Sequence, residues 1–120
     1  MIEETQPHNP VTWSQVERDG VTILEVHGDI DLSTVPHLRG PLTQRMADRP
    51  FILDLQDVPF MDSAGLALIV EARNGFTNRA AFSVTVREQS QPARILRLGQ
   101  FDRFMHIASI ETGPSTEDVV

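Results

Sequence analysis

One serine, Ser63, occupies the position in this chain where a hydroxyl group is best placed to react. It lies in the segment Met61-Asp62-Ser63-Ala64-Gly65-Leu66, which follows a turn at Asp57-Val58-Pro59 and begins an apolar helical pattern. The first turn of a helix has backbone N–H groups without intrahelical partners and the positive end of the helix dipole. It therefore favours a serine oxygen or an attached phosphate. This placement predicts a serine that is modified by phosphorylation rather than a buried catalytic centre.

Ser63 also has a purely structural interpretation, as the N-cap of the helix. A serine cap typically contributes ~1 kcal/mol and needs no further function, and placement alone favours this interpretation. Gly65 weighs against simple helix building, because glycine costs ~1 kcal/mol relative to alanine inside a helix. The small residues Ala64 and Gly65 are expected to leave Ser63 accessible to the active site of a second protein.

An enzyme with Ser63 as its nucleophile is an alternative. Such an enzyme needs a base, normally a histidine oriented by an acid, and an oxyanion hole. Met61 stands where the first glycine of a G-x-S-x-G nucleophile elbow would be. His106 and Asp102 lie downstream and do not by themselves indicate a triad. Labelling of Ser63 by a fluorophosphonate probe would support a serine hydrolase.

Two further groups of polar residues have side chains that can serve in metal or acid–base sites. Asp29 and Asp31 lie two residues apart in a polar loop, but no third ligand is signalled nearby. A solvated turn is the default interpretation of this pair, with a partner contact as the alternative. The histidines show none of the helical spacings of a metal site; they are His8, His27, His37 and His106. The sequence predicts no metal site.

The periodicity of apolar residues predicts an α/β fold with a mixed sheet of about four to five strands. Strands are expected at residues 11–17 and 21–27, joined by an Asp19-Gly20 hairpin turn, then at 51–55 and 82–87. Residues 106–110 fit either a last strand or the start of a helix. Strands that alternate with helices favour parallel pairing through right-handed crossovers, with the helices packed against the sheet.

Three helices are predicted between these strands. The first carries Val35, Leu38, Leu42 and Met46, with Ser33 or Thr34 as its cap. Pro41 lies inside it and predicts a kink or a late true start. The second helix follows Ser63 and is expected to end at Gly75. Its apolar face is predicted to contain Leu66, Ile69, Val70 and Arg73, thickened by Leu68 and Ala72. The third covers residues 93–98 and ends at Gly99.

Length and composition indicate one domain in a reducing compartment. The chain has 120 residues, no cysteine and a net charge of -7, and all ten basic residues are arginines. The acidic balance without a basic stripe argues against direct nucleic-acid or membrane binding. We expect a cytoplasmic protein with a flexible leader at 1–10, a domain at 11–112 and a flexible tail at 113–120. The separate arginines Arg94, Arg97 and Arg103 form either a solvated helix face or a contact for acidic partner residues.

Three segments of the chain resemble a STAS domain of the bacterial anti-sigma factor antagonist family. VTILEVHGDIDLST (21–34) is similar to the family's opening strand and its Gly-acid-aliphatic-Asp turn. ILDLQDVPFMDSAGLALIV (52–70) is similar to its central strand, loop and phosphoacceptor helix. ARILRLGQFDRFMHI (93–107) is similar to its late helix and following loop. The order and coverage of these segments make the resemblance specific to the whole domain.

The resemblance implies a partner-switching cycle. The unphosphorylated antagonist binds an anti-sigma factor that is itself a serine kinase and so releases a sigma factor. The kinase then phosphorylates the antagonist with ATP, and a phosphatase reverses this. Ser63 fills the phosphoacceptor position, and the antagonist needs no cofactor of its own. The implied partner-binding residues are Asp31, Ser33, Asp62, Ala64 and Gly65.

Two departures and two family alternatives accompany this resemblance. Pro41 is unusual in the first helix, and Met61 replaces a more typical β-branched residue. A STAS scaffold subunit of a sensing complex, or an accessory subunit of a lipid transporter, would share the fold with other partners. The Asp-Ser-x-Gly pattern at 62–65 favours the antagonist. The absence of a glycine-rich phosphate loop followed by lysine argues against nucleotide binding by the domain itself.

Overall fold

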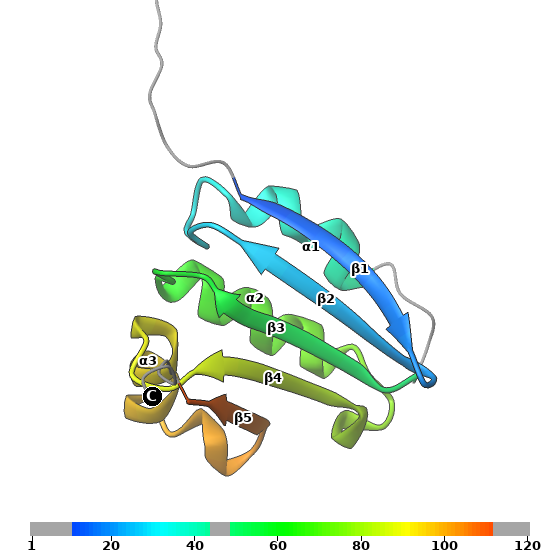
Figure 1. Cartoon of the computed structure of the whole chain (residues 1–120). Coiled ribbons are helices and arrows are strands. Elements are labelled where there is room, and N and C mark those ends of the chain that lie inside the picture. Colours follow the sequence, from blue (N-terminus) through cyan, green and yellow to red (C-terminus); the bar gives the residue numbers. More distant parts are fainter. Residues whose placement is uncertain (1–10, 44–48, 112–120) are drawn as a thin grey trace, which may run out of the picture.

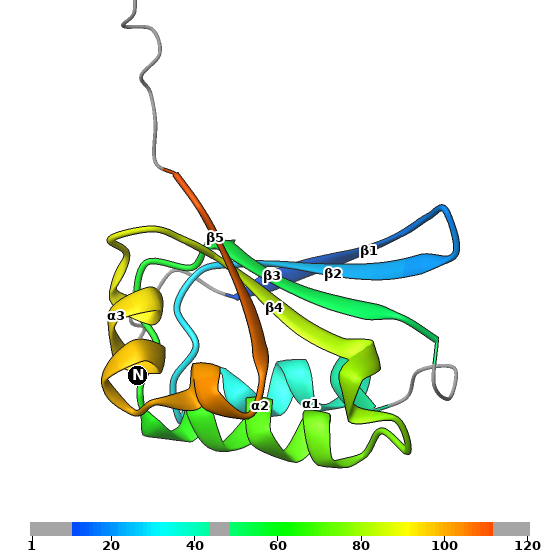
Figure 2. The same ribbon diagram turned by 90° about the horizontal axis from the view of Figure 1, so that it is seen from below.

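The computed structural model describes residues 11–43 and 49–111, which form a five-stranded mixed sheet with helices against one face (Figure 1, Figure 2). The strands are β1 (Thr12–Arg18), β2 (Val21–His27), β3 (Phe51–Asp57), β4 (Phe82–Arg87) and β5 (His106–Ile110). The helices are α1 (Val35–Thr43), α2 (Ser63–Asn74) and α3 (Gln91–Leu98), with short 3-10 turns η1 (Arg79–Ala81) and η2 (Phe101–Arg103). The predicted leader, the predicted tail and residue 112 lie outside the described residues.

The strands lie side by side in sequence order, β1 to β5. β1 and β2 form an antiparallel hairpin whose turn residues, Asp19 and Gly20, both have positive φ, of 54° and 80°. This is the backbone of a tight primed turn, so the predicted hairpin is confirmed. β2 to β5 are parallel. Because each crossover adds the next strand on the same side, right-handed connections place the helices on one face, as Figure 2 shows.

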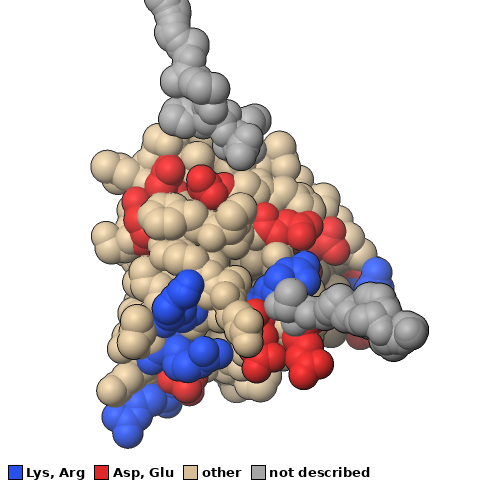
Figure 3. Space-filling model, turned by 60° about the vertical axis from the view of Figure 1, so that its left-hand side comes forward, with Lys and Arg blue, Asp and Glu red and all other residues tan. Residues whose placement is uncertain are grey.

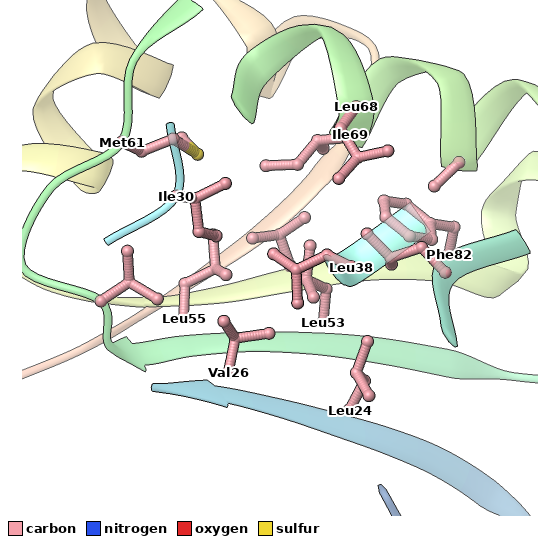
Figure 4. Close-up of a cluster of buried hydrophobic side chains, with 14 of the residues drawn as sticks. Leu24, Val26, Ile30, Leu38, Leu53, Leu55, Met61, Leu68, Ile69 and Phe82 are labelled. Atoms are coloured by element: carbon pink, nitrogen blue, oxygen red, sulfur yellow. The ribbon is translucent and has the colours of Figure 1, made fainter. Parts of the chain in front are cut away.

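The core lies between the sheet and helices α1 and α2. Each parallel strand from β2 to β4 alternates buried and half-buried residues, as a strand with one covered face must. Leu68 and Ile69 of α2 point towards the inner face of β3 (Figure 4). Three rings, Phe51, Phe76 and Phe82, close the far end of this core, with centroids 5.6 to 6.0 Å apart.

The first helix differs from its prediction at its start. α1 begins at Val35 and continues through Pro41 to Thr43, so of the two predicted alternatives, a kink or a late start, the late start is wrong. Pro41 is tolerated because it lies in the last turn, where its missing N–H removes only the one hydrogen bond that it would have donated to the His37 carbonyl. The Thr43 hydroxyl donates to the Arg39 carbonyl at 2.6 Å in the same turn. Met46 falls outside the described residues.

The buried face of α2 is also rotated from the predicted one. Its buried residues are Gly65, Leu68, Ile69 and Ala72, whereas Leu66, Val70 and Arg73 are only half-buried. Gly65 therefore faces the core instead of the surface. The predicted end at Gly75 is confirmed. α3 starts at Gln91, two residues before the prediction, because Ser90 is its N-cap, and residues 106–110 form the strand β5.

Candidate functional site

The candidate site forms where the chain leaves the carboxyl ends of β2 and β3. Beyond the strands, Ile30 and Met61 form an isolated parallel bridge. The Ile30 N–H donates to the Phe60 carbonyl at 3.0 Å, and the Asp62 N–H donates to the Ile30 carbonyl at 3.1 Å. Both side chains of the bridge are buried beneath α2 (Figure 4). The bridge holds the polar loop after β2 against the start of α2 and brings Asp31 and Asp62 into one region.

Asp62, not Ser63, is the N-cap of α2. Its Oδ1 accepts hydrogen bonds from the N–H groups of Ala64 at 2.9 Å and Gly65 at 3.1 Å. The structural interpretation of Ser63 as the cap is therefore wrong. Ser63 is exposed in the first turn, and its hydroxyl forms no hydrogen bond with any described residue. The hydroxyl is left free to react at the positive end of the helix.

The Asp62 carboxylate also connects the two loops. Its second oxygen, Oδ2, accepts a hydrogen bond from the Leu32 N–H at 3.3 Å. One side chain thus satisfies N–H groups from α2 and from the loop after β2. The Leu32 side chain that this bond brings beside Asp62 is 76% exposed. An exposed leucine whose backbone is bound to Asp62 gives the site an apolar surface that sequence patterns did not single out.

Asp31 organises the turn that leads into α1. Its Oδ1 accepts hydrogen bonds from the Ser33 hydroxyl at 2.7 Å, the Ser33 N–H at 3.0 Å and the Thr34 N–H at 3.1 Å. The buried Thr34 hydroxyl accepts from the Asp31 N–H at 2.9 Å and donates to the Asp29 carbonyl at 2.8 Å. Asp31 therefore caps this turn, and the prediction that Ser33 or Thr34 caps the helix is wrong. Ser33 is exposed beside it.

These hydrogen bonds change the acidity of Asp31. The pKa of its carboxyl is lowered chiefly by the Ser33 hydroxyl, against the opposing effect of desolvation, with further lowering by the N–H groups of Thr34 and Ser33. A pKa below the unfolded value of about 3.9 stabilises the folded chain above that pH. This contribution is lost as the pH falls through the folded pKa.

Ser33→Ala is expected to raise the pKa of Asp31 towards its ordinary value, because it removes the largest of the interactions that lower it. Carbon-13 NMR titration of the Asp31 carboxyl measures this directly. The stability difference between wild type and variant should be larger at neutral pH than at a pH where Asp31 is protonated in both. An unchanged Asp31 titration would contradict the assigned hydrogen bond.

Gly65 supports the site from below. A β-carbon at this position would lie 2.5 Å from Met61 Cγ and 2.9 Å from Ile30 Cγ2. The glycine therefore lets α2 approach the bridge closely enough for Asp62 to reach both Ala64 and Leu32. Of the site residues implied by the resemblance, Asp31, Ser33, Asp62 and Ala64 are exposed or half-buried, whereas Gly65 is buried. Gly65 can act on a partner only through the residues that it positions.

A residue that sequence reasoning missed, Gln91, contacts the same segment from α3. Its side-chain amide accepts from the Met61 N–H at 2.8 Å and donates to the Met61 carbonyl at 2.9 Å. No local pattern points to this contact, because the two residues are thirty positions apart and belong to different elements.

Charged side chains separate on this side of the molecule. Figure 3 turns the carboxyl ends of the parallel strands forward and shows acidic groups over the upper part of this side and most of the arginines over the lower part, where some acidic groups also lie. The site contributes carboxylates from Asp29, Asp31 and Asp62, whereas α3 and η2 contribute exposed Arg94, Arg97 and Arg103. The carboxylates already make this surface negative. Additional negative charge at Ser63 would therefore be unfavourable where the surface contacts another protein.

The structure does not assemble the alternative sites. His106 begins β5 opposite Ser83, at the amino end of the parallel strands, whereas Ser63 follows their carboxyl ends. The two residues lie at opposite ends of the parallel strands, an arrangement that does not fit a catalytic triad. His27 pairs with Asp57 at 2.9 Å. Within residues 11–43 and 49–111, no group of three or more His, Asp or Glu side chains is arranged to hold a metal ion.

Comparison with known proteins identifies the family. The STAS domain family matches residues 12–116, and the chain belongs to this family. The anti-sigma-F factor antagonist RsfB of Mycobacterium tuberculosis is 29% identical over 79 residues, which are 64% of this chain and 65% of RsfB. The crystal structure of an anti-sigma factor antagonist from Mycobacterium paratuberculosis is similar with a TM-score of 0.76 and 26% identity, over 93% of this chain and 94% of that one.

A more distant similarity supports the fold alone. The unphosphorylated form of the anti-sigma factor antagonist SpoIIAA has a TM-score of 0.52 and 15% identity, over 90% of this chain and 94% of that one. The predicted STAS-like mixed sheet with an initial hairpin is thereby confirmed. In the described part of this chain, no helix is long and apolar enough to cross a bilayer.

Proposed function

We propose that this protein is an anti-sigma factor antagonist that is switched off by phosphorylation of Ser63. In this function the unphosphorylated chain binds an anti-sigma factor that is also a serine kinase, and the sigma factor is released. The observation that carries the proposal is the free, exposed Ser63 hydroxyl in the first turn of α2, whose N-cap is Asp62. The two mycobacterial relatives, both anti-sigma factor antagonists by name, support the same role.

The proposed modification is a phosphoryl transfer in which this chain supplies only the acceptor. The Ser63 oxygen forms a bond to the γ-phosphorus of ATP held by the kinase, the bond to the β,γ-bridging oxygen breaks, and ADP leaves. The hydroxyl proton passes to a base of the kinase. A phosphatase returns the hydroxyl by hydrolysis with release of phosphate. The antagonist itself holds no cofactor in this cycle and acts in the cytoplasm without touching nucleic acid or membrane.

The proposed partner-binding surface combines two segments of the chain. Asp31 and Ser33 contribute the loop after β2, and Asp62 and Ala64 contribute the start of α2, with Gly65 supporting them from below. The exposed Leu32 and Phe60, 76% and 43% accessible, add apolar contacts on either side of the bridge. Small and apolar groups around one hydroxyl allow a kinase active site to approach closely.

A phosphorylation assay tests this function. The purified chain is incubated with ATP and each candidate anti-sigma factor kinase of the same genome, and mass spectrometry maps the modified residue. Ser63→Ala should take up no phosphate, whereas Ser33→Ala, which removes the neighbouring exposed hydroxyl, should still be phosphorylated at Ser63. No transfer from any candidate, together with a stable complex with a transporter or a sensing assembly, would instead support the accessory or scaffold role.

A further inference from the structure

The amide side chain of Gln91 binds both polar groups of one peptide residue, Met61. Its oxygen accepts from the Met61 N–H at 2.8 Å and its nitrogen donates to the Met61 carbonyl at 2.9 Å. Gln91 is the first residue of α3 and is half-buried, and the Met61 side chain is fully buried. A single side chain therefore fixes the backbone two residues before Ser63.

This contact takes the place of a missing strand. The sheet order puts β3 between β2 and β4. Beyond the strands, Ile30 continues the line of β2 and pairs with Phe60 and Asp62 on one side of the extended segment. In an extended segment, the N–H and C=O of the intervening residue point to the opposite side. β4 has already ended at Arg87, and the Gln91 amide supplies the donor and the acceptor that a neighbouring strand would have supplied.

We propose that Gln91 is a positioning residue that holds Ser63 for phosphoryl transfer. The inference rests on the proposed function, because it concerns the same hydroxyl. Ile30 holds the segment from the side of β2, and Gln91 holds it from the side of α3. Asp62 and Ser63 follow directly, so a loss of either restraint displaces the cap and the hydroxyl together. Small displacements of a reacting atom cost large factors in rate even when binding is retained.

The chemistry of the contact allows a sharp test by Gln91→Glu. At neutral pH a carboxylate can accept from the Met61 N–H but cannot donate to the Met61 carbonyl, which it would repel. Once protonated, a carboxyl group offers one donor and one acceptor, like the amide. The variant should therefore lose the hydrogen bond to the Met61 carbonyl at neutral pH. It should regain this bond as the pH falls through the pKa of the introduced carboxyl. Gln15→Glu, on exposed β1, makes the same chemical change away from the site.

The expected results are a rate effect and a local exchange effect. At neutral pH, Gln91→Glu should lower kcat for Ser63 phosphorylation about tenfold while KM changes less than about threefold, because the exposed Leu32 and Ser33 of the loop after β2 remain available for binding. Amide hydrogen exchange at Asp62, Ala64 and Gly65 should become about tenfold faster than in wild type at the same pH. That ratio should return towards one at acidic pH. Gln15→Glu should change neither quantity.

Each outcome separates the positioning role from the proposed function. If no kinase phosphorylates the wild type, the proposed function fails, and the exchange ratio still tests the contact. If the wild type is phosphorylated and Gln91→Glu matches its kcat, Gln91 is not a positioning residue, whatever the exchange shows. If Gln91→Glu does not fold at neutral pH, Gln91→Asn, which keeps both polar groups but is shorter by one methylene, replaces it in the same comparison.

Discussion

Ser63→Asp is expected to weaken binding to the anti-sigma factor kinase at least about 100-fold, whereas Ser63→Ala should bind within a few-fold of wild type. A factor of 100 corresponds to about 2.7 kcal/mol. An unpaired charge that a partner covers typically costs several kcal/mol, so this factor is a lower bound. The Ser63 hydroxyl forms no hydrogen bond with described residues, so its removal leaves no partner unsatisfied within the domain. Calorimetry or surface plasmon resonance with the unmodified kinase measures both affinities.

The expected effect lies at the interface and not in the fold. At the first turn of α2 the helix dipole favours a new anion by about 0.3 to 2 kcal/mol, and the neighbouring Asp62 carboxylate opposes it. These two contributions offset each other within the domain. Ser63→Asp should therefore keep the wild-type Tm within a few degrees and the wild-type circular dichroism spectrum. The same reasoning applies to the phosphoserine, which adds about −1.5 to −2 charges.

A control places the same charge elsewhere. Gln15→Asp adds a carboxylate to exposed β1, and Gln15 pairs with Leu24 in the middle of the strand, away from the carboxyl end of β2. This variant should bind the kinase like wild type. Equal affinity of Ser63→Asp and Ser63→Ala would rule out charge burial as the switching mechanism. Equal losses for Ser63→Asp and Gln15→Asp would show that net charge, and not the position of the charge, governs binding.

Gly65→Ala is expected to lower the free energy of unfolding by about 2 kcal/mol, although alanine is the better helix former. The added methyl group would lie 2.5 Å from Met61 Cγ, 2.9 Å from Ile30 Cγ2 and 3.2 Å from the Ile30 carbonyl oxygen. Overpacking of a buried site costs about 1 to 3 kcal/mol or more, and the gain in helix propensity of about 1 kcal/mol offsets only part of it. Both clashing residues form the bridge, so relief of the clash must move the loop that carries Asp62.

Urea unfolding of Gly65→Ala and Gly40→Ala separates the clash from propensity. Gly40 lies in α1, and apart from its chain neighbours and the backbone of α1 itself, no atom of the described residues lies within 4 Å of a β-carbon placed there. Gly40→Ala should change stability by less than about 1 kcal/mol, since propensity favours it and the following Pro41 disfavours it. A Gly65→Ala protein as stable as wild type, with unchanged kinase binding, would contradict a packing role for this glycine.

The sheet could be predicted from sequence because its signals are local. β2 alternates buried and half-buried residues over its whole length, and Asp19-Gly20 specifies the hairpin turn. The predicted bounds of β2 and β4 match the structure. β3 is longer than predicted by Gln56 and Asp57, because pairing with β2 continues through the polar residues. Strand pairing overrides residue type there.

The helices and the site were less predictable, because tertiary contacts decide them. The apolar face of α2 was misplaced because Leu66 and Val70 are as hydrophobic as the residues that are buried. Ser63 and Asp62 are both good caps by type, and only the backbone of the loop selects Asp62. The contact of Gln91 with Met61 depends on where α3 lies beyond β4, which no spacing in the chain encodes.

Ser63 follows β3, the middle strand of five, and this position sets how well the switch tolerates fluctuations of the fold. Edge strands are the first parts of a sheet to open. Transient opening of β5 at one edge, or of β1 at the other, removes no hydrogen bond of the Ile30–Met61 bridge. In the proposed cycle of phosphorylation and dephosphorylation, the Ser63 hydroxyl therefore keeps its position while the edge strands open and close.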